Sequence, residues 1–192
     1  MKILGITGGI GSGKSVVSKL LEINGIPVYN TDIAAKKIYD SSPRIRQKLI
    51  QRFGEELYAG GLLNRKLLAS HIFQSPEDLK FVNSIVHPEV ENDFEDWKNQ
   101  FPGKKWAGIE SAILFESGLH QKTDIVINVS ADYETKIARV QQRDKFSREE
   151  IDCRIRQQTD DTTRCELANF TIINDNSHAL LPQIEKMLNR FE

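Results

Sequence analysis

A glycine-rich loop near the start of the sequence carries the residue types that bind polyphosphates. The run Gly8–Ser15 fits the spacing G-x-x-x-x-G-K-[ST], in which backbone N–H groups turn toward the phosphates. The lysine, Lys14, can reach the terminal phosphates, and the hydroxyl of Ser15 can ligate Mg²⁺. We predict a nucleotide-binding loop here rather than a turn that matches by chance. The residues assigned to the nucleotide are Gly9, Gly11, Ser12, Gly13, Lys14, Ser15 and Val16.

Asp32 is the best candidate for a catalytic base. It lies just beyond a second apolar run, at 26–29, where the chain enters a helical pattern. The carboxyl ends of parallel strands meet at one edge of a sheet, so Asp32 is expected beside the phosphate loop. There it could orient and deprotonate an attacking hydroxyl. The alternative role is that of an N-cap for a helix over 33–39, and the two roles are compatible.

Two arginines have the spacing of a phosphate clamp. Arg139 and Arg143 lie four residues apart on a predicted helix and so share a face. Guanidinium groups match phosphate oxygens and stay charged, which suits the stabilisation of a phosphoryl-transfer transition state. The alternative is a solvated helix face, with Arg143 paired to a nearby acid.

Two glutamates are candidates at the ends of apolar runs. Glu110 ends the predicted third strand at the same edge as the loop, where it could hold Mg²⁺ or its water shell. It could equally be a strand-end acid that caps a neighbouring loop. Glu116 follows the apolar run at 113–115 and is equally open to either interpretation.

Two further polar residues lie in the long segment after the second strand. His87 precedes Pro88 at an expected break between two helical patterns, where a packing or turn residue is typical. Arg65 follows Asn64, an expected N-cap, and is either a solvated helix start or a contact to an anionic substrate.

The elements that must position these residues alternate along the chain. Helical patterns separate the apolar runs, which predicts an α/β fold with a parallel sheet. The region 31–103 has helical patterns throughout, and we predict that it forms a subdomain that binds the second substrate. We predict that 139–164 forms a lid. The remaining regions, 1–30, 104–138 and 165–192, form the nucleotide-binding core. The five predicted strands are 2–6, 26–29, 106–109, 124–129 and 170–173.

Composition excludes several classes of protein. The 192 residues carry a net charge of −1, so no bulk field favours nucleic acid or an anionic membrane. The segment 139–166 holds seven basic and seven acidic side chains, unlike a one-sided nucleic-acid arm. No apolar run approaches 18 residues, so no transmembrane helix is expected. We expect a cytoplasmic protein, a monomer or small homo-oligomer, whose Cys153 and Cys165 stay reduced.

Taken together, these segments resemble the dephospho-CoA kinase family. The resemblance rests on GITGGIGSGKS at 5–15, LLNR at 62–65, HP at 87–88, ILFE at 113–116 and RVQQRD at 139–144. It spans nearly the whole chain in the family's order. It implies ATP- and Mg²⁺-dependent phosphorylation of the 3′-hydroxyl of dephospho-CoA, the last step of coenzyme A synthesis. It also implies a P-loop NTPase fold with a five-stranded parallel sheet flanked by helices, a helical substrate-binding insertion and a helical lid.

The resemblance also implies roles for individual residues. Asp32 becomes the base, and Lys14 and Ser15 lie at the ATP phosphates and Mg²⁺. Arg139 and Arg143 contact phosphates during lid closure. The remaining assignments are Arg65, His87 and Glu116 on the substrate side, and Asn174 and Asn176 at the adenine edge.

Two other functions share the loop. A nucleoside or nucleoside-monophosphate kinase would have the same fold and lid. A P-loop switch NTPase would bind nucleotide without an acceptor, but the guanine-switch motifs D-x-x-G and N-K-x-D are absent from the sequence.

Overall fold

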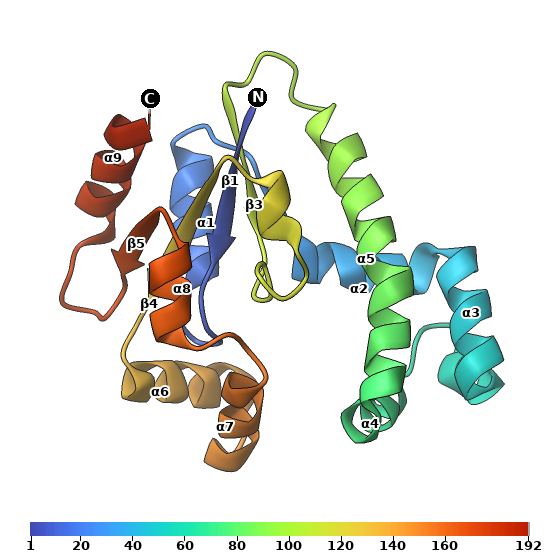
Figure 1. Cartoon of the computed structure of the whole chain (residues 1–192). Helices are drawn as coiled ribbons and strands as arrows, with labels where there is room; N and C mark the ends of the chain where they lie inside the picture. The colour runs from blue at the N-terminus through green and yellow to red at the C-terminus, as the bar shows by residue number, and fades with distance from the viewer. Residues whose placement is uncertain (192) are drawn as a thin grey trace. The chain divides into compact units, whose positions relative to one another are not determined.

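The computed structural model describes residues 1–191 and divides into two compact units. The core unit is formed by Met1–Asn30 with the chain from Phe101 onward, and the inserted unit is Thr31–Gln100. Figure 1 shows the elements of both. The inserted unit lies in sequence between the second and third strands of the core unit.

The core unit is built on five parallel strands in the order β2-β3-β1-β4-β5. The five strands predicted from apolar runs are confirmed, with ends that shift by one or two residues. Helices flank the sheet, and Figure 1 shows the arrow of β1 directed toward the end of this unit where α6 and α7 lie. The strands are β1 (Lys2–Thr7), β2 (Val28–Asn30), β3 (Trp106–Glu110), β4 (Ile125–Ser130) and β5 (Phe170–Ile173). The helices are α1 (Lys14–Ile23), η2 (Leu119–Lys122), α6 (Tyr133–Asp144), α7 (Arg148–Arg156), α8 (Asp161–Leu167) and α9 (Leu180–Phe191).

The main core of this unit lies between the sheet and the helices α1 and α9. Val17 and Leu21 of α1 are fully buried against β1, β4 and β5, and Ile184 and Met187 of α9 complete the cluster. Val16, by contrast, is 50% exposed, so the buried face of α1 is narrower than its run of apolar residues indicates. Burial of such aliphatic side chains supplies about 1.5–3 kcal/mol each, and anchors the helix that follows the glycine-rich loop.

The strand register brings three strand ends to the same level. Glu110, the last residue of β3, is paired with Ile6 of β1 and with Asn30 of β2. Thr7, at the end of β1, is paired with Asn128 of β4. The carboxyl ends of the central strands therefore share one edge, where the glycine-rich loop leaves β1.

Side-chain caps fix several helix starts. Ser42, Ser75, Asn64 and Asp132 each accept a hydrogen bond from a backbone N–H in the first turn of the helix that follows. Ser147 forms a full capping box with the third residue of α7. The cap expected at Asn64 is thus confirmed, and each of these caps contributes about 1 kcal/mol to its helix.

The inserted unit is helical throughout. Its elements are α2 (Thr31–Ser41), α3 (Pro43–Phe53), η1 (Glu55–Tyr58), α4 (Arg65–Gln74) and α5 (Pro76–Lys98). It has a small core of its own, although Phe73 and Leu79 are 54% and 42% exposed. Buried core residues include Ile38, Ile45, Leu49, Leu57, Leu68, Val82, Val86, Val90 and Phe94.

The expected helix break at Pro88 is wrong. Helix α5 runs without interruption from Pro76 to Lys98 with Pro88 inside it. Proline removes one backbone hydrogen bond and usually kinks or ends a helix. Here Val86 and Val90 on either side of it are both buried, so the packed face continues through the proline and offsets that loss.

None of the helices within 1–191 combines the length and the apolar character needed to cross a membrane.

Candidate active site

The glycine-rich loop is held tightly by the elements behind it. Gly11 and Gly13 have φ angles of 79° and 88°, a region that residues with a Cβ rarely adopt. A Cβ on Gly11 would lie 2.5 Å from the carbonyl oxygen of Lys136, and one on Gly13 would lie 2.1 Å from Nδ2 of Asn174. Both positions therefore require glycine for packing as well as for backbone conformation.

Lys14 is folded back onto the loop. Its Nζ donates hydrogen bonds to the carbonyl oxygens of Gly8 over 2.8 Å and Gly9 over 3.3 Å, and the residue is 9% exposed. Its ammonium is thus already inside the curve of the loop. The hydroxyl of Ser12 is buried without a hydrogen-bond partner within the described chain. Such a group usually finds a partner, and a phosphate oxygen would supply one.

Arg139 binds the outer side of the same loop. Its Nη1 donates to the carbonyl oxygens of Ser12 and Asn174, over 3.4 and 2.9 Å, and its Nη2 donates to Oδ1 of Asn176 over 2.6 Å. The Asn174 amide donates to the Ser12 carbonyl oxygen over 2.8 Å. The structure therefore brings Arg139, Asn174 and Asn176 together, with the guanidinium occupied by carbonyl and amide oxygens.

Arg143 has different surroundings although it lies one turn further along α6. Its Nε and Nη2 donate to the two carboxylate oxygens of Asp144 over 2.9 and 2.6 Å. The side chain is 63% exposed. The pairing with a nearby acid, which the sequence left open, is present. An exposed pair of this kind contributes only about 0–1 kcal/mol, so little free energy is lost when this one pair breaks.

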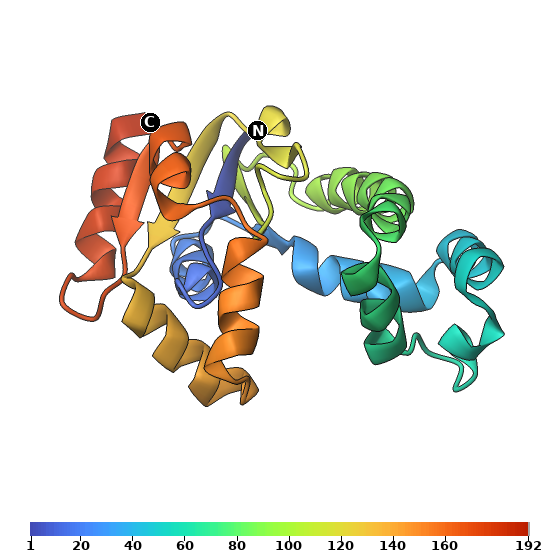
Figure 2. The same ribbon diagram turned by 60° about the horizontal axis from the view of Figure 1, so that its bottom comes forward.

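The segment predicted as a lid shares an apolar core with the loop. Ile10 packs against Ile137, Val140 and Ile151, three buried residues of α6 and α7. Figure 2 shows these two helices on either side of the end of α1 that leaves the loop. Both helices are therefore packed directly against the phosphate loop.

The connection between α7 and α8 is tied to this region by polar contacts. Gln158 accepts a hydrogen bond from the Ile10 backbone N–H over 3.0 Å and donates to the Ala112 carbonyl oxygen over 3.3 Å. Glu116 accepts from the Thr159 N–H over 2.6 Å. The structure therefore places Glu116, a candidate on the substrate side, on a backbone N–H of the predicted lid segment.

Two predicted side chains carry oxygen atoms of the kind that Mg²⁺ binds. Ser15 is exposed in the first turn of α1, and Glu110 is 6% exposed at the end of β3. Within residues 1–191 no cluster of three or more His, Cys, Asp and Glu side chains could hold a metal unaided. Mg²⁺ commonly binds through one or two protein oxygens together with phosphates and water. Ser15 and Glu110 fit that mode.

Asp32 lies in the inserted unit. Helix α2 begins at Thr31, so Asp32 is in the first helical turn and the N-cap role considered for it is wrong. Its carboxylate is exposed and has no hydrogen-bond or ion-pair partner in the part of the chain that the structure describes. It follows by two residues the strand end at Asn30, which is paired with Glu110. The carboxylate is therefore available to a substrate proton.

Arg65 is anchored by a neighbouring acid. Its Nη2 donates to Asp40 Oδ2 over 2.7 Å and to the Lys36 carbonyl oxygen over 2.9 Å. The Leu63 backbone N–H and the Arg65 guanidinium both lower the pKa of Asp40. Burial raises the pKa of the adjacent Tyr39 to about 12, so its phenol stays neutral. Arg65 is about half exposed and remains accessible to an anion.

His87 lies on α5, with a half-buried ring. Burial lowers its pKa, and Glu91 one turn later partly offsets that effect. Helix α5 is continuous through His87, so the turn considered for this position is not present.

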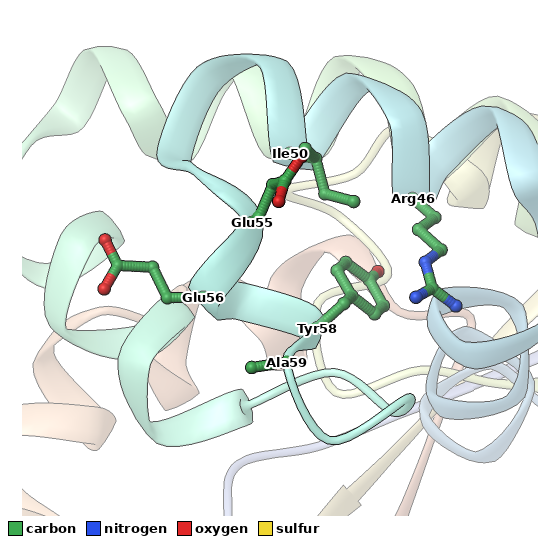
Figure 3. A pocket seen from close by; sticks show the side chains of 6 residues that line it. All are labelled: Arg46, Ile50, Glu55, Glu56, Tyr58 and Ala59. Carbon is green, nitrogen blue, oxygen red and sulfur yellow. The ribbon is translucent and has the colours of Figure 1, made fainter.

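A pocket of about 380 Å³ opens on the inserted unit between α3 and η1 (Figure 3). The Arg46 guanidinium lies 4.9 Å from the centre of the Tyr58 ring and donates to the Gly61 carbonyl oxygen. Glu55 and Glu56 also line the pocket, so its formal charge is −1. This charge disfavours a phosphate group, and none of the residues predicted for the site lies there.

Comparisons with known proteins show the family to which the chain belongs. The family model for dephospho-CoA kinase matches residues 2–179. The chain belongs to the dephospho-CoA kinase family. A dephospho-CoA kinase of Bacteroides fragilis is 45% identical over 185 residues, which cover 96% of this chain and 90% of that protein.

Solved structures of similar proteins extend the likeness to the fold. A Thermus thermophilus protein superposes with a TM-score of 0.87 at 31% identity and covers 100% of this chain and 98% of its own. The dephospho-CoA kinase of Campylobacter jejuni superposes with a TM-score of 0.71 at 26% identity, and the match covers 99% of this chain and 97% of that one. The fold predicted from the phosphate loop and the alternating elements, that of a P-loop kinase, is confirmed.

Membership of the dephospho-CoA kinase family makes the chain an enzyme, and the structure adds residues that the sequence analysis missed. Lys136 and Arg164 are both buried next to Gly9 of the loop and are linked by Asp161. A signal for Lys136 was present in the sequence, because it precedes Arg139 by three residues on the same helix face. Arg164 lies on a separate helix, and no local pattern connects it to the loop.

Proposed function

We propose that this chain transfers the γ-phosphoryl group of ATP to the 3′-hydroxyl of dephospho-CoA, giving coenzyme A and ADP, the last step of coenzyme A biosynthesis. The observation that carries the proposal is the phosphate loop at the carboxyl end of β1, in a chain whose family match covers residues 2–179. Phosphoryl transfer needs positioning and charge stabilisation more than covalent chemistry from the protein. The candidate side chains are of the types that provide both.

The core unit binds ATP in this proposal. Lys14 and the backbone of Gly9–Ser15 hold the phosphates, with the positive end of α1 behind them. Ser15 and Glu110 hold Mg²⁺, which when bound offsets the charge of the β- and γ-phosphates. Asn174 and Asn176 lie at the adenine edge, and their link to Arg139 supports this placement.

Asp32 accepts the proton of the 3′-hydroxyl as that oxygen attacks phosphorus. An exposed carboxylate without a protein partner suits this role, since nothing has to be displaced before a substrate hydroxyl reaches it. The inserted unit, 31–103 by sequence and Thr31–Gln100 by structure, binds dephospho-CoA. Arg65, held by Asp40, meets an anionic group of that substrate, and Glu116 and His87 complete the substrate side.

The segment 139–164 closes as a lid. Arg143 exchanges Asp144 for phosphate oxygens, and Arg139 keeps the loop and the β5–α9 connection together as closure proceeds. Closure excludes water, which would otherwise compete as acceptor.

The two free thiols, Cys153 and Cys165, support a reducing compartment, the cytoplasm.

The test is the release of ADP by the purified protein with Mg²⁺-ATP and dephospho-CoA, beside AMP, CMP, UMP and adenosine as acceptors. The proposal expects turnover with dephospho-CoA alone, and a product phosphorylated at the 3′ position by phosphorus NMR. Turnover with a monophosphate instead would mean that the inserted unit binds a smaller substrate than dephospho-CoA. ATP binding without transfer to any acceptor would favour a switch.

A further inference from the structure

Two buried cations beside the phosphate loop share one carboxylate. Lys136 of α6 and Arg164 of α8 have side chains that are 4% and 3% exposed. The Lys136 ammonium contacts Oδ2 of Asp161, and Arg164 Nη1 donates to Oδ1 of the same carboxylate over 2.8 Å. Asp161 itself is 48% exposed. The cluster of Lys136, Asp161 and Arg164 therefore carries a formal charge of +1.

This cluster lies directly against the loop. A Cβ added to Gly9 would lie 3.1 Å from Arg164 Nη1, 3.4 Å from Asp161 Oδ1 and 3.6 Å from Lys136 Nζ. The carbonyl oxygen of Gly9 accepts a hydrogen bond from Lys14. The ammonium groups of Lys14 and Lys136 thus approach the same glycine of the loop. The missing side chain of Gly9 is what leaves room for the cluster.

The cluster lacks one anionic partner. A buried charge is costly unless an opposite charge or hydrogen bonds compensate for it. Here the Lys136 ammonium and the Arg164 guanidinium share a single carboxylate. In addition, Nε of Arg164 is buried with no hydrogen-bond partner in residues 1–191. An oxyanion at Gly9 would supply both the missing charge and further acceptors.

The chain around Asp161 holds the cluster in this position. Asp160 caps α8 by accepting from the Thr163 N–H, and Gln158 ties the preceding turn to the Ile10 N–H of the loop. Asp161 is therefore fixed relative to Gly9 by its neighbours on both sides. A single ion pair between Lys136 and Asp161 would be enough to attach α8 to α6. The second buried cation, Arg164, is therefore not needed for that attachment.

We propose that Lys136 and Arg164 form a second cationic arm for the terminal phosphate of the bound nucleotide, and that Asp161 positions them. The inference rests on the proposed function. In phosphoryl transfer the charge spreads over the equatorial oxygens of the transferred group, and cations fixed in a dry site stabilise it better than solvated ones. Lys14 and Lys136 then approach the terminal phosphate from two directions.

The decisive comparison is between ATP and ADP. Lys136→Met removes the charge and keeps most of the length. We expect it to weaken binding of Mg²⁺-ATP about tenfold and of Mg²⁺-ADP less than threefold in calorimetric titrations, because only ATP has the terminal phosphate. Lys136→Arg is expected to retain most of the affinity for ATP. Lys186→Met, at an exposed lysine on α9, is the control and should leave both affinities unchanged.

Equal losses for ATP and ADP, or none, would reduce the cluster to a link between α6 and α8 and overturn the inference. Should Lys136→Met fail to fold, Arg164→Lys provides the same comparison, since it keeps the charge but loses Nε and the fork. The binding readout needs no acceptor. Failure of the native protein to phosphorylate dephospho-CoA would count against the proposed function, whereas an unchanged ratio of ATP to ADP affinity in these variants would count against the inference alone.

Discussion

The side-chain amide of Asn174 donates a hydrogen bond to the carbonyl oxygen of Ser12 over 2.8 Å, across 162 positions of the sequence. The backbone N–H of Asn174 donates in turn to the Ser130 carbonyl oxygen over 2.7 Å at the end of β4. One 9%-exposed asparagine therefore links the phosphate loop to the ends of β4 and β5.

Replacement of Asn174 by alanine should loosen the loop. It leaves the Ser12 carbonyl oxygen with fewer partners, which costs about 1–3 kcal/mol of unfolding free energy. We expect weaker ATP binding together with lower stability, measured by calorimetric titration and urea denaturation. Asn189→Ala on the exposed face of α9 is the control. Unchanged stability of Asn174→Ala would show that the loop does not depend on this amide.

The two arginines of α6 should separate stability from activity. Arg139 makes several charge-assisted hydrogen bonds to the loop and to Asn174 and Asn176, so Arg139→Ala should destabilise the protein by about 2 kcal/mol or more. Arg143→Ala removes an exposed pair with Asp144 and should change stability by less than about 1 kcal/mol. If Arg143 meets phosphate during lid closure, its removal lowers kcat at least tenfold all the same. Thermal unfolding and steady-state kinetics distinguish the two, and an Arg143→Ala enzyme with native kcat would contradict the clamp.

Asp32→Ala tests the base. General base catalysis contributes about 10²–10⁴ in rate, so kcat should fall by that factor while the Kd for ATP changes less than threefold. Glu56→Gln, at an exposed acid of the same unit, is the control for loss of one negative charge. Retained turnover, or an equal loss of ATP affinity, would remove Asp32 from the role of base.

Glu110→Gln tests the magnesium assignment. The amide keeps the shape of the buried side chain but ligates Mg²⁺ more weakly than a carboxylate. We expect the Mg²⁺ concentration for half-maximal activity to rise about tenfold, with much of kcat recovered at high Mg²⁺. A titration of activity against Mg²⁺ decides this. Loss of kcat at every Mg²⁺ concentration would point instead to a structural role at the end of β3.

His87 should make stability depend on pH in the mildly acidic range. Burial lowers its pKa in the folded protein, so below the ordinary value of about 6.5 the unfolded chain binds more protons than the folded one. Its contribution is therefore present above pH 6.5 and is lost as pH falls toward the folded pKa. Each unit of pKa difference corresponds to at most about 1.4 kcal/mol. Urea denaturation between pH 7.5 and 5.5 should show a shallower decline for His87→Gln, and identical slopes would contradict the prediction.

The sequence was most informative where one local pattern decided the structure. Five buried strands, four helix caps and the loop were predictable because apolar runs, capping residues and glycine spacing act over a few neighbours. Pro88 was misjudged for the opposite reason. Its effect on the helix was decided by tertiary packing, since buried Val86 and Val90 on either side of it continue the packed face.

The predictable part of the site was likewise its local part. Lys14 and Ser15 follow from the loop motif, and the roles of Asp32 and Glu110 remain predictions based on their places at strand ends. The position of Arg139 on the carbonyl oxygens of the loop and the convergence of Lys136 with Arg164 required the fold. These contacts join segments that no periodicity relates, because residues of α6 and α8 meet only where both helices pack against the loop.

The strand order has a consequence for synthesis on the ribosome. Strand β2 follows β1 in the chain but does not pair with it, because β3 lies between them. Neither can form its shared ladder with β3 until the chain has been made as far as Glu110. At about 5–20 residues per second, the apolar segments of β1 and β2 wait several seconds or more while the whole inserted unit is translated. During that interval the nascent phosphate loop lacks its sheet, and chaperones that recognise apolar segments have their best access to this kinase.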